Sequence, residues 1–333
     1  MTSLTILDRV PEGLLDAAAH DLGEVLDGPT LIELGAGDRA PLFVSVLLHG
    51  NEDSGLGAVQ RVLRTYADKP LPRPLMILIG NVAAASKGLR RLDGQPDFNR
   101  VWPGCEEDED SDEARIMAEV HRRVIARHAF AAIDIHNNTG RNPHYAVVCV
   151  REPEVMALAA RFAPRAVLFR GLPGTQTSSF SGLIPAITIE CGQPGCEANA
   201  AAAADLVHNV LVLDDLAAMP GDAHLALFHT LARVRVKPGI ALARRVDGPW
   251  LALDPELDRH NFSHVEPGFR FGATDGPMPV EVVDEQGQDV AHNYFVVEDG
   301  ELRVRQDVIP AMLTVDERII RQDCLCYIME ELP

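Results

Sequence analysis

The stretch Pro41–Glu52 reads PLFVSVLLHGNE and decides the fold class of this chain. Its first eight residues form an apolar run bounded by proline and by polar residues, which is typical of a buried strand in a largely parallel sheet. The last four, His49-Gly-Asn-Glu52, place an imidazole and a carboxylate three residues apart where a helical pattern begins. That spacing lets both side chains converge on one metal ion. The stretch therefore predicts a layered α/β protein with a metal site at the end of a strand.

Three more apolar runs of this kind follow along the chain, with helical spacing between them. The predicted strands are residues 74–80, 131–136 and 184–190, and the predicted helices are residues 55–66, 112–128, 152–162 and 197–216. Short buried strands that alternate with helices indicate an α/β domain. The sequence GAGDRA at 35–40 has the glycines of a dinucleotide-binding turn, but Pro41 opens a strand at once, so we predict a hairpin turn there.

The pattern changes after about residue 221. Short Val-rich segments separated by turn residues follow, such as MPVEVVDEQG and NYFVVEDG, and they are typical of antiparallel strands. We therefore predict two domains, an α/β domain at residues 1–225 and a smaller β domain at residues 226–333, with the boundary between 220 and 232.

The charge of the chain excludes two classes of partner. Lys and Arg total 30 and Asp and Glu total 49, which gives a net charge of −19. Nucleic acids and anionic membranes both demand a basic surface, so neither is an expected partner. No apolar run approaches the length of a membrane span, and the start of the chain lacks a leader pattern. Six scattered cysteines without metal-ligand spacing indicate reduced thiols in a cytoplasmic protein.

A third candidate metal ligand, His136, ends a predicted strand in the run DIHNNT. Two histidines and one glutamate, with one position open for water, form the ligand set of a catalytic rather than a structural zinc site. The candidates His49, Glu52 and His136 also lie at the carboxyl ends of strands, where open α/β sheets bind their ligands. Asp134, two residues before His136, is expected to lie on the opposite face of the strand and to be structural.

Two further elements strengthen the case for catalysis. In DFNR, the guanidinium of Arg100 beside the amide of Asn99 offers bidentate recognition of a carboxylate, and Arg90 or Arg91 upstream can polarise a carbonyl and hold a developing oxyanion. Glu190 ends the last predicted strand of the first domain. A carboxylate beside a metal is placed to take a proton from water.

The motifs HGNE, DFNR, DIHN and ITIECGQPG, in this order on an α/β domain followed by a β domain, resemble those of the succinylglutamate desuccinylase/aspartoacylase family of the zinc carboxypeptidase superfamily. The resemblance implies a zinc-carboxypeptidase-like fold, with a mixed, mostly parallel sheet flanked by helices. It also implies one Zn²⁺ per chain held by His49, Glu52 and His136. Asn99 and Arg100 would then bind a carboxylate of the substrate.

The implied reaction is hydrolysis of the amide bond of a small N-acyl amino acid, in which a zinc-bound water attacks the acyl carbonyl and Glu190 is the general base. The insertion GQP at 94–96 lengthens the segment before Asn99. Arg90 and Arg91 therefore compete for the oxyanion role, with Arg91 slightly favoured.

Two alternatives remain open at this stage. The first is a zinc carboxypeptidase that acts on peptides or cell-wall fragments, and the second is a zinc-binding sensor or scaffold without catalysis. Asn137 and His144 are further candidates for lining the pocket. The expected partner is a small anionic acyl-amino acid, and the sequence leaves a homo-oligomer open.

Overall fold

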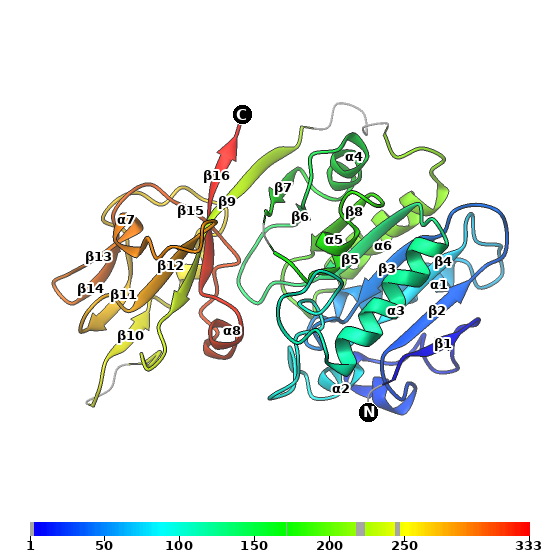
Figure 1. Ribbon diagram of the computed structural model, residues 1–333, viewed down its shortest axis with the longest axis horizontal. Coiled ribbons are helices and arrows are strands. Elements are labelled where there is room, and N and C mark those ends of the chain that lie inside the picture. The colour runs from blue at the N-terminus through cyan, green and yellow to red at the C-terminus, as the bar shows by residue number, and fades with distance from the viewer. Residues whose placement is uncertain (1–2, 171, 218–223, 244–246) are drawn as a thin grey trace. The chain divides into compact units, whose positions relative to one another are not determined.

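The computed structural model describes residues 3–170, 172–217, 224–243 and 247–333 (Figure 1). The chain divides into two compact units. Unit 1 comprises Met1–Asn137 and His144–Leu225, and unit 2 comprises Asn138–Pro143 and Ala226–Pro333. Part of the predicted boundary region, residues 218–223, lies outside the described residues.

Unit 1 is built on one mixed sheet with the strand order β1-β2-β4-β3-β5-β8-β6-β7. The central strands β4, β3, β5 and β8 are parallel to their neighbours in this series, whereas β2 pairs with β4 and β6 pairs with β8 in the antiparallel sense. The strands are β1 (Thr5–Leu7), β2 (Thr30–Leu34), β3 (Leu42–Val46), β4 (Leu75–Ile79), β5 (Ala131–His136), β6 (Tyr145–Val148), β7 (Arg165–Leu168) and β8 (Ala186–Glu190). The mostly parallel sheet confirms the predicted fold class, and each of the four apolar runs contains a strand.

The hairpin turn predicted at residues 35–40 is wrong. β2 does not pair with β3, because β4 lies between them in the sheet. A strand does follow at once, as Pro41 suggested, and no helix intervenes. Local turn residues show that the chain reverses, but the choice of neighbour depends on packing across the whole sheet.

Helices cover both faces of this sheet (Figure 1). α1 packs against α6 and against β3 and β5, while the apolar side chains of α3 join a core cluster with those of β2, β3 and β4. The helices are η1 (Ala19–Glu24), α1 (Ser54–Thr65), α2 (Val82–Ala85), α3 (Asp112–Ala126), α4 (Pro153–Phe162), α5 (Gln176–Phe180) and α6 (Glu197–Val212). The four predicted helices are confirmed as α1, α3, α4 and α6. Their apolar stripes were readable because each helix buries one face.

Strand parity decides which side chains reach the functional face of the sheet. Val46 and Ile135 face α1, since a Cβ at Gly55 in that helix would lie 2.9 Å from the Cβ of Val46 and 3.2 Å from that of Ile135. Successive side chains of a strand point to opposite faces. Ser45 and Asp134 therefore point to the other face, which α3 and α5 cover.

On that face the side chains change from apolar to polar toward the carboxyl ends of the strands. The registered rows are Phe43–Ala132–Ala186, then Ser45–Asp134–Thr188, and finally His136–Glu190. The first row belongs to the hydrophobic core with α3, whereas the second and third carry hydroxyl, carboxyl and imidazole groups. The polar end of this face is where a site can form.

Unit 2 contains two antiparallel sheets, with the strand orders β12-β9-β16-β15 and β10-β11-β14-β13. The strands are β9 (Ala226–Val236), β10 (Trp250–Leu253), β11 (Arg270–Asp275), β12 (Val280–Asp284), β13 (Phe295–Glu298), β14 (Glu301–Val304), β15 (Ile309–Ala311) and β16 (Cys326–Leu332). The described residues of the unit also form the short helices η2 (Leu257–His260), α7 (Ala291–Tyr294) and α8 (Glu317–Gln322). Side chains from both sheets, including Val234 and Phe271, share one core. The Val-rich pattern of the sequence thus does form antiparallel strands.

The segment Asn138–Pro143 belongs to unit 2 although it follows β5 directly. The buried Asn261 holds it, since its Nδ2 donates to the carbonyl oxygens of Arg141 (3.3 Å) and Leu313 (2.9 Å). The N–H of Met312 also donates to Oδ1 of Asn142 at 3.0 Å. The chain therefore passes through unit 2 once within the residues predicted for the first domain.

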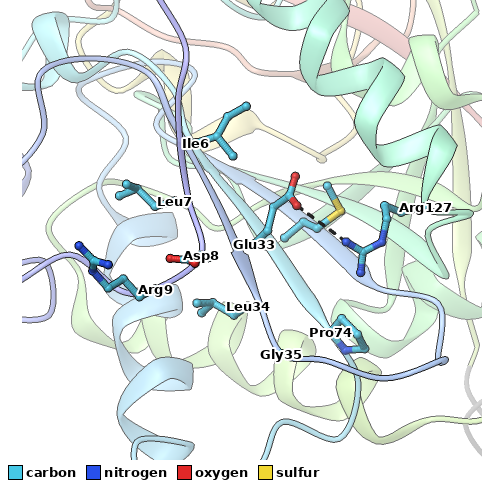
Figure 2. A pocket seen from close by; sticks show the side chains of 10 residues that line it. Ile6, Leu7, Asp8, Arg9, Glu33, Leu34, Gly35, Pro74 and Arg127 are labelled. Atoms are coloured by element: carbon cyan, nitrogen blue, oxygen red, sulfur yellow. Dashed lines mark ion pairs between the residues drawn. The ribbon is translucent and has the colours of Figure 1, made fainter.

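A surface hollow of about 390 Å³ lies beside β1 and β2 (Figure 2). Asp8, Arg9, Glu33 and Arg127 are its charged lining residues, and the Glu33 and Arg127 side chains approach to 3.8 Å. Two acidic and two basic groups balance, so the hollow offers little net field to a charged ligand. None of the predicted site residues lines it. Among the described residues, no helix is both long and apolar enough to cross a membrane.

Candidate active site

The turn after β3 brings the HGNE motif into a tightly packed position. Leu47 has a φ of 54°, a left-handed conformation that is uncommon for a bulky residue and is often found at functional sites. Gly50 donates its N–H to the carbonyl of Arg90 at 3.0 Å, and a Cβ at Gly50 would lie only 2.2 Å from the backbone nitrogen of Ala85. Only a glycine therefore fits between His49 and the helix α2.

The structure brings His49, Glu52 and His136 together as a buried group, with one ligand atom of each within 4.8 Å of the others. The Glu52 carboxylate lies between the two imidazoles, with Oε1 at 2.9 Å from Nδ1 of His49 and Oε2 at 2.7 Å from Nδ1 of His136. The other ring nitrogens face separate carboxylates. Nε2 of His49 is 3.0 Å from Asp97, and Nε2 of His136 is 2.6 Å from Asp134.

This donor set fits a zinc ion. Two imidazole nitrogens and one carboxylate, all buried, are the protein ligands of many catalytic zinc sites. A metal-binding histidine usually donates its other N–H to a carboxylate or carbonyl, which fixes the ring and its tautomer. Both His49 and His136 have such a partner on Nε2, so both can present Nδ1 to one ion.

The charges within the group perturb its titration. Burial raises the pKa of Glu52, but the charges and hydrogen bonds of His49 and His136 outweigh burial and hold that pKa far below its usual range. Burial lowers the pKa of His136, but Asp134 and Glu52 outweigh it and raise that pKa well above 6.5. Without a metal, Glu52 therefore stays negatively charged and His136 stays protonated. A bound cation could replace the extra proton on His136.

Glu190 ends β8 directly opposite His136 in the parallel register. Its side chain is buried, and burial raises its pKa to about 8, with Glu52 and Asp134 adding to the rise and His136 opposing it. A carboxyl group that titrates near neutral pH can both accept and return a proton. Glu190 thus lies beside the metal-ligand group as a buried carboxyl group with a raised pKa.

The structure separates the two candidate arginines. Nη1 of Arg90 is 3.6 Å from Oε1 of Glu52, and Nη2 donates to Asp97 at 3.2 Å. Nη1 of Arg91 instead donates to the backbone carbonyl of Gln95 at 2.8 Å. Burial raises the pKa of Asp97, but His49 and Arg90 outweigh burial and lower it well below its usual range. Of the two arginines, Arg90 borders the metal-ligand group.

Asn99 lies inside the polar network rather than at its surface. Its Oδ1 accepts the N–H of Gln176 at 2.9 Å, and its Nδ2 is 3.3 Å from Asp134 and 3.2 Å from Nε2 of His136. Arg100 donates from Nη1 to the carbonyl of Asn99 at 2.7 Å. The loop that contains Asn99 therefore contacts the metal-ligand group at His136.

The expectation that Asp134 faces away from His136 is wrong. Residues two apart in a strand point to the same face, and the Asp134 carboxylate is 2.6 Å from the His136 ring. The contact between Asp97 and His49 was also missed, although the DFNR motif contains Asp97. Asn137 supports Glu52, since its N–H donates to Oε2 at 3.1 Å.

His144, a second candidate for lining the pocket, makes other contacts. Its Nε2 pairs with Oδ1 of Asn199 at 2.9 Å, and its ring stacks on Phe162 with the ring centroids 5.4 Å apart. Both partners lie on helices of unit 1, so these contacts tie the start of β6 to α4 and α6.

A mixed sheet with a buried His-Glu-His group at the carboxyl ends of its central strands defines an α/β protein with a potential zinc centre. Residues 41–213, just over half of the chain, match the model of the succinylglutamate desuccinylase/aspartoacylase catalytic domain. The chain therefore belongs to the succinylglutamate desuccinylase/aspartoacylase family. No curated protein sequence matches it.

Solved structures with the same fold include several of this family. The succinylglutamate desuccinylase of Vibrio parahaemolyticus has a TM-score of 0.61 at 13% identity, with 90% of this chain and 84% of that chain covered. That of Chromobacterium violaceum has a TM-score of 0.59 at 16% identity, with 88% and 85% covered. Murine aminoacylase 3 has a TM-score of 0.53 at 16% identity, with 88% and 95% covered. At these identities the likeness establishes the fold.

Proposed function

We propose that this chain is a zinc-dependent hydrolase that cleaves the amide bond of a small N-acyl amino acid. The observation that carries the proposal is the buried group of His49, Glu52 and His136 with Glu190 directly beside it, in a chain of the desuccinylase/aspartoacylase family. When bound, zinc would polarise the acyl carbonyl and lower the pKa of water from 15.7 toward about 7.

Glu190 is the general base in this proposal. It takes a proton from the attacking water and later returns the proton to the nitrogen of the leaving amine. Burial raises the pKa of this carboxyl group above that of an exposed glutamate, and a nearby cation would lower it again, so Glu190 could exchange a proton with water at the site.

Arg90, rather than Arg91, is the proposed oxyanion residue. Its guanidinium lies 3.6 Å from a metal ligand, whereas that of Arg91 is directed to a backbone carbonyl. This reverses the slight preference drawn from the sequence. A fixed cation next to the acyl carbonyl stabilises the negative charge that develops on its oxygen as water attacks.

Asn99 and Arg100 are proposed to bind a carboxylate of the substrate. Asn99 has two amide hydrogens on Nδ2, and one of them suffices for Asp134. The carboxylates of Glu52 and Asp134 already contact His136, and that of Asp97 contacts His49 and Arg90. The guanidinium of Arg100 would therefore be the group that recognises an anionic substrate, through hydrogen bonds to its carboxylate. Six free cysteines support a reducing, cytoplasmic location as part of the proposal.

The test is hydrolysis by the purified chain loaded with one equivalent of zinc. Release of free amine is measured for N-acetyl and N-succinyl amino acids and for peptides with a free carboxyl terminus. Hydrolysis of the acyl-amino acids supports the proposal. Cleavage of peptides alone would indicate a carboxypeptidase, and no hydrolysis of any amide would indicate a binding protein.

The substitution Glu190→Gln tests the base. It should lower kcat by about 10²- to 10⁴-fold, the range of general acid–base catalysis, and leave the zinc content unchanged. Glu197→Gln is the matched control, because Glu197 is an exposed carboxylate paired with Arg61 on the surface. Equal kcat values for Glu190→Gln and Glu197→Gln would show that Glu190 is not the general base.

A further inference from the structure

Asp134 is the most deeply buried carboxylate in the metal-ligand region, with 0% of its surface exposed. Three side chains contact it. Ser45 donates its hydroxyl to Oδ1 at 2.7 Å, Nε2 of His136 lies 2.6 Å from Oδ2, and Nδ2 of Asn99 lies 3.3 Å from Oδ2. Burying a carboxylate is costly unless it is hydrogen-bonded, and these three contacts offset the cost of burying Asp134.

Asp134 forms one of the two carboxylate contacts of the His136 ring. A carboxylate only accepts hydrogen bonds, so the short contact at Nε2 places a hydrogen there. Nδ1 faces the Glu52 carboxylate at 2.7 Å, so without a metal it carries a hydrogen as well. A metal ion bound by Glu52 would take the place of the Nδ1 hydrogen, and Asp134 would keep the hydrogen on Nε2.

The neighbours of Asp134 also fix its orientation. Asn99 cannot donate to a protonated Nε2, so its amide hydrogen goes to Oδ2 of Asp134. The N–H of Gln176, at the start of α5, bonds Oδ1 of Asn99 and thereby decides which end of that amide carries the hydrogens. Ser45 on β3 holds the second carboxylate oxygen. Ser45 of β3 and Asn99 thus hold the carboxylate directly, and the backbone of α5 holds Asn99.

We propose that Asp134 is a positioning residue of the zinc site, which holds the His136 ring in the tautomer and orientation that present Nδ1 to the ion. The inference rests on the proposed zinc-dependent function. In this inference Asp134 does not bind the metal itself and affects metal affinity only through its contact with His136.

The test measures zinc affinity by competition with a chelator of known affinity, so it does not depend on any substrate. Asp134→Ala should weaken zinc binding by about 10- to 100-fold, the usual effect of losing such a partner of a metal-binding histidine. Asp134→Asn should weaken it less, because the amide oxygen still accepts the Nε2 hydrogen but carries no charge. Asp258→Asn is the matched control, since Asp258 is a buried aspartate of unit 2 outside this group.

A second readout separates positioning from a merely structural role. In the zinc-loaded protein labelled with ¹⁵N-histidine, the Nε2 hydrogen of His136 should give a slowly exchanging NMR signal, and Asp134→Ala should abolish it while the circular dichroism spectrum stays native. If the alanine variant does not fold, Asp134→Asn carries the test through its weaker zinc binding.

Zinc affinity within twofold of the unmodified protein in a folded Asp134 variant, with the signal retained, would overturn the inference alone. Failure of the unmodified protein to bind zinc would instead overturn the proposed function together with this inference.

Discussion

Replacement of Arg90 by alanine is expected to slow the reaction without removing the metal. The Arg90 guanidinium is buried, with Nη1 at 3.6 Å from Glu52 and Nη2 at 3.2 Å from Asp97. Glu52 keeps its contacts with His49 and His136 when Arg90 is removed, so we expect the ligand set to survive the substitution. The lost positive charge should matter most when negative charge develops on the acyl oxygen.

The expected magnitude follows from two independent scales. Unit charges 4 Å apart interact by about 4 kcal/mol at an effective dielectric constant near 20. The loss of one oxyanion donor typically costs about 3 kcal/mol, or about 10²- to 10³-fold in kcat. Because the two scales agree, we expect Arg90→Ala to lower kcat by at least about 100-fold.

The assay compares Arg90→Ala with Arg91→Ala in steady-state hydrolysis of an N-acyl amino acid, with the zinc content of each protein measured in parallel. Arg91→Ala removes a hydrogen bond to the carbonyl of Gln95 and should leave kcat nearly unchanged, because Arg91 contributes no interaction to the transition state in this proposal. A large loss in Arg91→Ala together with near-normal activity in Arg90→Ala would refute the reasoning.

Two further predictions concern the metal site and its packing. Because Asp134 and Glu52 raise the pKa of His136 well above 6.5, the metal-free protein should keep a proton on His136 at pH 7, and zinc should displace about one proton. Zinc affinity should therefore rise as the pH rises toward that raised pKa, and calorimetry in buffers of different ionisation enthalpy that detects no proton release would contradict this. Gly50→Ala would place a Cβ 2.2 Å from the backbone of Ala85 and should destabilise the fold by about 1–3 kcal/mol in chemical unfolding. Gly28→Ala, where no atom lies within 4 Å of the added Cβ, is the control, and equal stability of the two variants would show that the turn tolerates a side chain.

Much of unit 1 could be predicted because its signals are local. Leu42–Val46 and Leu75–Ile79 are buried on both faces, so the sequence shows continuous apolar runs there. The face of α1 that packs on the sheet gives an apolar stripe with helical spacing. The pairing of the metal-ligand candidates His49 and Glu52 is equally local, since only one short turn separates the two residues.

Contacts between distant segments could not be predicted in the same way. Asp97 contacts His49, which lies 48 residues earlier in the chain, and no local sequence pattern predicts this contact. The placement of β4 between β2 and β3 likewise depends on the whole sheet.

By itself the sequence determined the fold class and the three residues that can hold a metal. The types of side chain and the short spacings between them indicate which strands are buried and which residues can bind an ion. Only the tertiary structure separated Arg90 from Arg91, since adjacent residues in a loop have no periodicity to say which one faces the site. It also showed that Asp134 supports His136 and that Asn99 is held by Gln176. Those relations exist only where strands, loop and helix pack together and exclude water, because a buried polar group must find its partner there.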